Sequence, residues 1–149
     1  MVFIKIDIEI NAPTETVWKA ISDIRTHVNW MADASKIRIT SEHTEGIGVT
    51  FDCETRVGPL RTTDKMEITE WASNEIMAIS HNGLVEGKGS FILERTSDGE
   101  TLFTWEENLN FPFLLGGKIT GFFAKPVLKK IWKKNLYKLK QLVEISDKS

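Results

Sequence analysis

The chain has 149 residues, of which 41% are hydrophobic and 27% are charged, and its formal net charge is −2 at pH 7. These values are typical of one soluble globular domain with a single core. The near-neutral charge gives no general attraction to nucleic acid. The one cysteine, Cys53, cannot form an internal disulfide, and no apolar run approaches the roughly 20 residues of a membrane span.

The N-terminal segment, residues 3–10, alternates apolar and charged side chains, which predicts a half-buried strand. A signal peptide would need a continuous apolar stretch here, so we expect a cytoplasmic protein. A short amphipathic helix is predicted over residues 13–24, followed by a helical turn or loop over 23–31, because apolar residues recur at helical spacing: Val17, Trp18, Ile21 and Ile24.

Six strand-like segments follow, separated by short turns rich in Gly, Pro, Asn and Asp: 36–42, 49–57, 60–68, 75–81, 88–96 and 101–110. Turns this short join antiparallel neighbours, so we expect an antiparallel sheet of six to seven strands. The turn Glu45-Gly46-Ile47-Gly48 leads into a strand. A phosphate-binding loop would lead into a helix, so we interpret this turn as part of a hairpin.

The C-terminal part is predicted to be a long helix that follows an apolar loop, residues 111–117. The loop is a candidate lid over a cavity, or its Phe111 and Leu114 simply fill the core. Pro126 must kink the helix or begin a new one. The apolar stripe of the helix is Leu128, Ile131, Trp132, Asn135, Leu139, Leu142 and Val143.

We therefore expect an α+β fold in which a curved antiparallel sheet wraps around the long helix, with two short helices after the first strand. The stripe on the helix needs burial, and the concave side of the sheet needs a cover. Residues 1–146 are predicted to form one domain, and residues 147–149 to fray.

Several motifs, taken in chain order, resemble one protein family. They are Ile8-Glu9-Ile10-Asn11-Ala12-Pro13, the stretch from Val17 to Asp23, Trp30, Gly99-Glu100-Thr101 with Trp105 beyond it, Pro126, and Leu139-Lys140-Gln141-Leu142-Val143-Glu144. This order resembles the START-like helix-grip superfamily (SRPBCC), and in particular its polyketide cyclase/dehydrase and lipid-transport branch. The resemblance covers nearly the whole chain. It implies the helix-grip fold and a cavity for ligands such as lipids, quinones, sterols or polyketide-like aromatics.

A ligand cavity is therefore predicted between the sheet and the long helix. The expected wall residues are Trp30, Phe51, Cys53, Thr55, Met66, His81, Phe91, Trp105, Glu107, Phe111, Leu114, Ile131 and Asn135. Thr62, Asp64 and Asn108 are further polar candidates, although a slip of one residue in register would reverse every strand face. A carboxylate buried in such a wall would need a partner or a raised pKa.

No residue set has the spacing of a metal site or of a covalent catalyst, so no cofactor, metal or catalytic residue is assigned. His27, His43 and His81 are scattered, and His81 is the one we expect near the site. Cys53 is expected to act as a small hydrophobic residue, because no base is evident that would make it a thiolate.

Eight lysines and no acidic residue lie between positions 118 and 140, which leaves 11 basic and 21 acidic residues in the rest of the chain. Contact with an anionic membrane is one interpretation of Lys118, Lys125, Lys129, Lys130, Lys133 and Lys134. A solvated helix face is the other. No aromatic motif for stacking bases accompanies them, so nucleic acid is not an expected partner.

Three functions remain open at this point. The first is non-catalytic binding or transport of an apolar small molecule. The second is acid-base catalysis of the cyclase/dehydratase kind, which requires at least two of His81, Asp64 and Glu107 to meet within hydrogen-bonding distance. The third is docking of a membrane or protein on the basic helix. We expect the first, because no spacing in the sequence demands catalysis.

Overall fold

The computed structural model describes residues 1–112 and 117–148. Seven strands form one antiparallel sheet in the order β1-β7-β6-β5-β4-β3-β2. The strands are β1 (Val2–Ile10), β2 (Ala34–Ile39), β3 (Thr50–Val57), β4 (Leu60–Ala72), β5 (Ile76–Asn82), β6 (Glu86–Arg95) and β7 (Thr101–Asn110). The helices are α1 (Thr14–Ile21), the 3-10 helix η1 (Ile24–Asn29) and α2 (Gly117–Lys148). The predicted fold class is confirmed.

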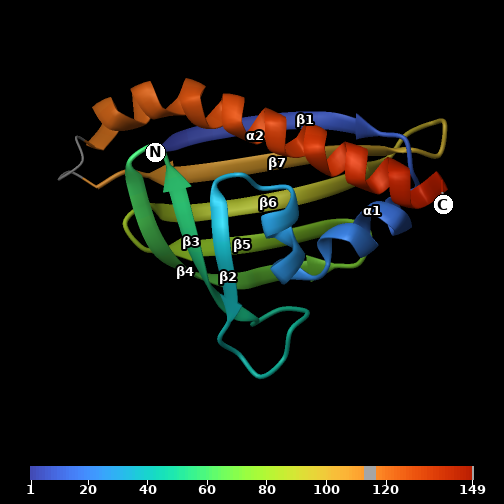
Figure 1. Cartoon of the computed structure of the whole chain (residues 1–149), viewed down its shortest axis with the longest axis horizontal. Helices are drawn as coiled ribbons and strands as arrows, with labels where there is room; N and C mark the ends of the chain where they lie inside the picture. The colour runs from blue at the N-terminus through green and yellow to red at the C-terminus, as the bar shows by residue number, and fades with distance from the viewer. Residues whose placement is uncertain (113–116, 149) are drawn as a thin grey trace.

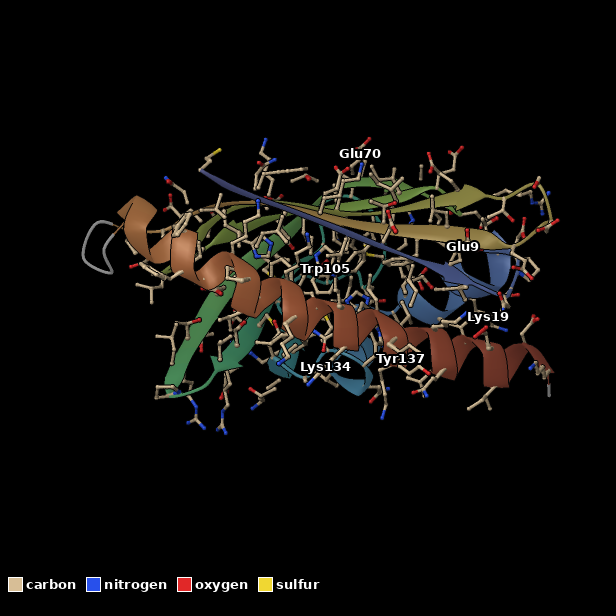
Figure 2. The ribbon with its side chains drawn as sticks, turned by 90° about the horizontal axis from the view of Figure 1, so that it is seen from above. Glu9, Lys19, Glu70, Trp105, Lys134 and Tyr137 are labelled. Carbon is tan, nitrogen blue, oxygen red and sulfur yellow. The ribbon has the colours of Figure 1, made fainter. Side chains whose placement is uncertain are left out.

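The long helix α2 runs beside β1 along the inner side of the sheet, while α1 lies at the end of the sheet where the chain terminates (Figure 1). The 3-10 helix η1 connects α1 to β2 and contacts both. The second half of α2 is held by side chains three or four residues apart, all nearly fully buried: Trp132, Asn135, Leu136, Leu139 and Val143. This spacing places them on one face of a helix. Lys134 and Tyr137 project from the face of α2 that points away from the sheet (Figure 2).

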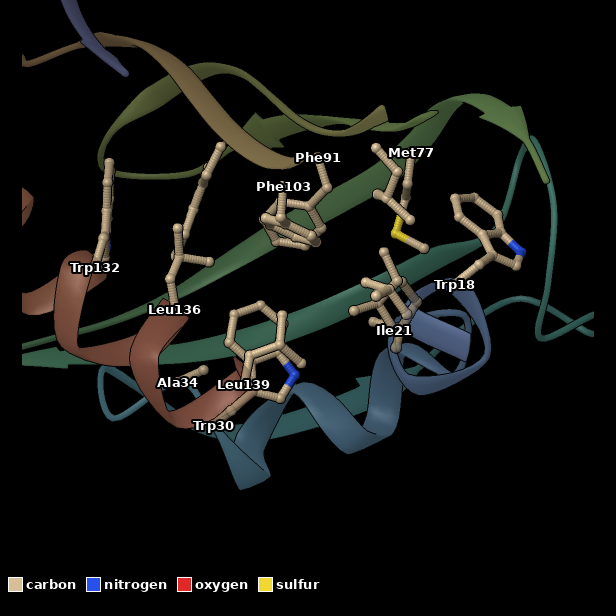
Figure 3. Close-up of a cluster of buried hydrophobic side chains, with 14 of the residues drawn as sticks. Trp18, Ile21, Trp30, Ala34, Met77, Phe91, Phe103, Trp132, Leu136 and Leu139 are labelled. Carbon is tan, nitrogen blue, oxygen red and sulfur yellow. The ribbon is translucent and has the colours of Figure 1, made fainter. Parts of the chain in front are cut away.

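The solid core lies between the sheet and this second half of α2. Phe91 and Phe103 face Leu136 and Leu139 of the helix, with Trp30 packed beside them (Figure 3). The rings of Phe91 and Phe103 lie 5.3 Å apart between centroids. Full burial of side chains this large contributes about 1.5–3 kcal/mol each relative to exposure.

Some element boundaries differ from the predicted ones. The second strand ends at Ile39 and not at 42, because Ser41 turns the chain: its hydroxyl donates to His43 O and accepts from Thr50 N. The first helix ends at Ile21, and Asp23 then caps η1 by accepting a hydrogen bond from Arg25 N.

The long helix continues through Pro126 as one element, so no new helix begins there. It also includes Asp147 and Lys148, within the segment predicted to fray. None of the helices within residues 1–112 and 117–148 has the length and apolarity needed to cross a bilayer.

Candidate functional site

A cavity of about 550 Å³ lies between the inner face of the sheet and the first half of α2. This volume falls within the range of small-molecule sites. Its sheet side is formed by inward residues of the six strands β2 to β7, among them Ile37, Phe51, Cys53, Thr55, Met66, Ile79, Phe91, Trp105 and Leu109. Its helix side is formed by Thr120, Phe123, Ala124, Val127, Leu128 and Trp132. The wall is therefore predominantly apolar.

The cavity opens beside the beginning of α2. Three of its lining residues are also exposed on the surface, with exposed fractions of 44% for Leu60, 68% for Phe123 and 51% for Val127. Leu60 begins β4, whereas Phe123 and Val127 lie one helical turn apart on α2. These residues form an apolar rim, which we call the mouth.

One polar cluster interrupts the apolar wall. Nε2 of His81 lies 3.0 Å from Oε2 of Glu107, and the indole Nε1 of Trp105 donates to Oε1 of the same carboxylate at 3.0 Å. The side chains of His81 and Glu107 are only 14% and 5% exposed. Glu107 therefore has a partner on each oxygen, as a buried carboxylate requires.

His81 and Glu107 meet because β6, which lies between their strands, carries glycine where they approach. Gly87 is in register with His81, and Gly89 is in register with Glu107. A Cβ atom on Gly89 would overlap the Glu107 carboxylate. Glycine inside a strand weakens it, so its presence here marks a close approach of other groups.

The environment of His81 sets its protonation. Burial alone would lower its pKa, but the adjacent Glu107 charge, the hydrogen bond to Glu107 and the nearby Asp64 together raise the pKa above the usual value. The ring nitrogen that faces Glu107 therefore carries a proton. Among the described residues, no hydrogen bond to the other nitrogen, Nδ1, accompanies this contact.

Asp64 is a second buried carboxylate in the wall, 7% exposed. Its side chain packs against Gly83 and occupies the space that a Cβ atom at this position would need. Within the described residues its Oδ1 atom has no hydrogen-bond partner. Burial raises the pKa of Asp64, and this outweighs the opposing effects of His81, the Leu84 backbone and Thr62. The folded protein thus disfavours the ionised form of this group.

This arrangement predicts that Asp64→Asn stabilises the protein by about 1 kcal/mol or more at pH 8. Burial raises the pKa of Asp64 above 3.8, so the stability of the wild type decreases as pH rises through the folded-state pKa of this group. The asparagine variant has no carboxyl group at this position and should not show this decrease. Urea unfolding at pH 4 and pH 8 measures the difference, which should shrink at pH 4. Glu67→Gln, an exposed position on the same strand, is the matched control.

A hydrogen-bonded latch, separate from the His81 cluster, joins α2 to the segment before β2. Asp33 accepts from Asn135 Nδ2 at 2.8 Å and from Trp132 Nε1 at 3.0 Å, and Asn135 Oδ1 accepts from Ala32 N at 3.0 Å. Trp132 in turn stacks on Trp105, with centroids 4.8 Å apart. The latch fixes the helix over the cavity.

Cys53 lies in the wall, and burial raises the pKa of its thiol to about 11. Since the thiolate is the reactive form, alkylation by iodoacetamide at pH 8 should be roughly a hundredfold slower in the folded protein than in urea. Mass spectrometry of timed samples measures both rates. Equal rates would contradict the buried placement of this residue.

Nine of the predicted wall residues line the cavity: Phe51, Cys53, Thr55, Met66, His81, Phe91, Trp105, Glu107 and Phe111. The polar candidates Thr62 and Asp64 also line it, whereas Asn108 is exposed on the outer face of β7. Leu114 lies outside the described residues, as does most of the loop that we considered as a lid.

Trp30, Ile131 and Asn135 do not line the cavity, which corrects their predicted placement. Trp30 packs within the core, 6.1 Å from Trp105 between centroids, and borders a different pocket formed by α1, η1 and the end of α2. Asn135 is taken up by the latch. Ile131 is half-buried and packs against the core beside Trp132, which lines the cavity in its place.

Several contributors were not predicted from the sequence, namely Asp33, the glycines of β6 and the helix residues Thr120, Ala124 and Val127. Gly87 and Gly89 gave a usable signal, because two glycines on the same face of a strand predict a close approach from neighbouring strands. His27 was assigned no site role, yet it lines the cavity. Its Nε2 donates to Ile21 O at 2.7 Å.

A family model described as polyketide cyclase / dehydrase and lipid transport matches residues 1–144. The chain belongs to this family. The helix-grip fold and the family resemblance read from the sequence are thereby confirmed. A search of curated proteins finds no match.

Solved structures with low sequence identity share the fold. The protein TTHA0849 from Thermus thermophilus is 13% identical with a TM-score of 0.80, and the match covers 97% of this chain and 98% of that one. The ZhuI aromatase/cyclase from Streptomyces sp. R1128 is 15% identical with a TM-score of 0.72, over 95% and 93%. The two-domain aromatase/cyclase StfQ of steffimycin biosynthesis is 9% identical with a TM-score of 0.81, over 99% of this chain and 52% of that one. At these identities the likeness shows the fold alone.

Within residues 1–112 and 117–148, no three His, Cys, Asp or Glu side chains are placed to hold a metal ion. The candidate site is therefore an apolar cavity with one polar cluster. It has an apolar mouth beside a lysine-rich helix.

Proposed function

We propose that the protein binds or carries an apolar small molecule in the cavity between the sheet and α2. The observation that carries this proposal is the cavity itself: about 550 Å³, lined mostly by aliphatic and aromatic side chains. Burial of apolar surface is the main favourable term for such a ligand. A lipid, a quinone and a polyketide-like aromatic all meet this description.

Native mass spectrometry of the purified protein tests the proposal, followed by denaturation and extraction of any molecule released. We expect an apolar molecule to co-purify with the protein in a stoichiometric amount. The Thr62→Trp variant should not retain this molecule, because the substitution places an indole in the cavity. Thr63→Trp is the matched control, because Thr63 is the exposed neighbour of Thr62 on the same strand. No companion, together with no thermal shift across lipids, quinones and aromatics, would contradict the proposal.

A second candidate function is acid-base catalysis, and the contact between His81 and Glu107 favours it. Glu107, held by Trp105, orients the imidazole, so Nδ1 of His81 is left to take a proton from a bound molecule or to give one. Glu107 would be a positioning residue in this scheme. The geometry meets the condition that two of the three candidate groups lie within hydrogen-bonding distance.

The companion molecule distinguishes the two functions. If His81 moves protons in a reaction, His81→Gln should co-purify with a molecule of different mass from that of the wild type, because the unreacted substrate accumulates. If the protein only binds, both forms should carry the same molecule. Glu106→Gln, which changes the neighbouring and more exposed carboxylate, is the control.

Peripheral contact with an anionic membrane is part of the proposal for a carrier. Lys125, Lys130, Lys133 and Lys134 are exposed and Lys129 is half-exposed, whereas the side chain of Lys118 lies outside the described residues. Phe122 and Phe123 project beside the mouth with exposed fractions of 75% and 68%. Exposed aromatics flanked by lysines suit the boundary of an anionic bilayer.

Vesicle co-sedimentation tests this contact. Binding to phosphatidylcholine vesicles containing phosphatidylglycerol should exceed binding to phosphatidylcholine alone and should fall with salt. Phe122→Ser should weaken it, while Tyr137→Ser, an exposed aromatic farther along α2, should not. A cytoplasmic location and the lack of a nucleic-acid partner stay predictions.

A further inference from the structure

Asp64 is the one polar side chain of the described cavity wall that holds a buried oxygen without a hydrogen-bond partner. The other polar groups are already engaged. Glu107 accepts from His81 and Trp105, and Asp33 accepts from Trp132 and Asn135. An unpaired buried acceptor is unfavourable, so a donor supplied by the bound molecule would restore the missing interaction.

The polar groups that remain available have a specific chemistry. Asp64 offers an acceptor, and the Nδ1 atom of His81, on the adjacent strand, offers a donor when the imidazole is protonated. His81 and Asp64 interact electrostatically, and this interaction favours the charged imidazole.

Four kinds of ligand end group can be compared against this pair. A carboxylate would meet the charges of Asp64 and Glu107 in a low-dielectric wall. An ammonium would meet the imidazolium, and a plain hydrocarbon would leave the Asp64 oxygen unpaired. A hydroxyl group both donates and accepts, and it carries no charge that must be desolvated.

We propose that the ligand is an apolar molecule with an uncharged hydroxyl group, an alcohol or a phenol, that hydrogen bonds to Asp64 and His81. The inference rests on the proposed binding function and deepens it by naming the ligand class. Asp64 lies against Gly83 in the β5–β6 connection, at the same end of the molecule as the start of α2 (Figure 1). The hydroxyl group therefore sits toward the mouth, and the apolar body lies deeper, against Phe51, Phe91 and Trp105.

Calorimetric titration with three probes that share one ring system tests the inference: naphthalene, 2-naphthol and 2-naphthoate. The wild-type protein, stripped of any companion, should bind 2-naphthol about tenfold more tightly than either of the other two, which is the effect of one or two net hydrogen bonds. The ratio of affinities for 2-naphthol and naphthalene is the quantity of interest, since it cancels general changes in the cavity.

Variants on β4 assign the effect to a residue. Asp64→Ala should reduce the ratio several-fold, because the hydroxyl group then keeps only its hydrogen bond to His81. Asp64→Asn should keep part of it, because the amide oxygen still accepts a hydrogen bond. Glu67→Ala, on the exposed face of the same strand, should leave the ratio unchanged. Oδ1 of Asp64 is buried without a partner, so its removal relieves an unfavourable burial and the Asp64 variants should remain folded.

The outcomes separate the two proposals. If all three probes bind equally, or if 2-naphthoate binds best, the hydroxyl inference is wrong while the binding function stands. An unchanged ratio in Asp64→Ala also overturns the inference. If naphthalene and 2-naphthol both fail to bind and no companion is found, the binding function fails as well.

Discussion

Replacing Glu107 by alanine should lower the free energy of unfolding by about 3–5 kcal/mol, the typical effect of breaking a buried charged pair. The substitution leaves two groups without a hydrogen-bond partner: the His81 imidazole and the Trp105 indole N–H both lose their acceptor. The side chain of His81 is 14% exposed and Trp105 is 2% exposed, so both groups are largely shielded from solvent. Urea unfolding at pH 6 measures the effect.

The neighbouring carboxylate provides the control. Glu106 points outward from the same strand and pairs with Lys5 at 3.7 Å, so Glu106→Ala should cost less than about 1 kcal/mol. The loss of unfolding free energy in Glu107→Gln should be intermediate between the losses in the two alanine variants, because the amide oxygen still accepts a hydrogen bond from one of the two donors. Similar losses in both alanine variants would contradict the role assigned to Glu107.

The same substitution has a pH signature. In the wild type the pKa of His81 is raised, so the stability contributed by its pairing is fully present below pH 6.5 and is lost as pH rises through the folded-state pKa. Without Glu107 the burial effect dominates, and the pKa of His81 should fall. Proton NMR of the His81 ring reports this shift directly.

The fold was predictable because alternating and helical periodicities are local properties of the sequence. Alternation indicated the strands and the existence of one buried face on the sheet, although it left open which face of each strand points inward. The stripe on α2 indicated the buried side of the helix, so the layers followed from the need to cover both elements. Boundaries were less well determined, since Ser41 ends β2 by a specific side-chain turn that periodicity does not encode.

The site was predictable only in part, because periodicity identifies a face and not the position along it. Core and cavity share the same inner face of the sheet, and the placement of α2 decides which residues belong to each. Ile131 and Trp132 are adjacent in sequence, yet only Trp132 lines the cavity. Asn135 was expected in the wall, but the Asp33 latch holds it, and that contact spans 102 positions of the chain.

His27 should make the protein unusually sensitive to acid. Burial lowers its pKa from 6.5 to about 4, against the smaller opposing effects of the Ile21 carbonyl and Asp23. Below pH 6.5 the unfolded chain takes up a proton at this position while the folded protein does not. Between pH 6.5 and 4 this difference should remove about 3 kcal/mol of stability.

The acid effect can be assigned because the two buried histidines respond to pH in opposite directions. As pH falls below 6.5, His27 destabilises the fold, whereas the raised pKa of His81 favours it. His27→Gln should therefore flatten the loss of stability between pH 6.5 and 4 in urea unfolding, and His43→Gln, at an exposed position, should not. An unaltered acid profile in His27→Gln would show that another group causes the transition. Since His27 lines the cavity, its protonation would also place a charge in the apolar wall, so ligand release should accompany the loss of stability.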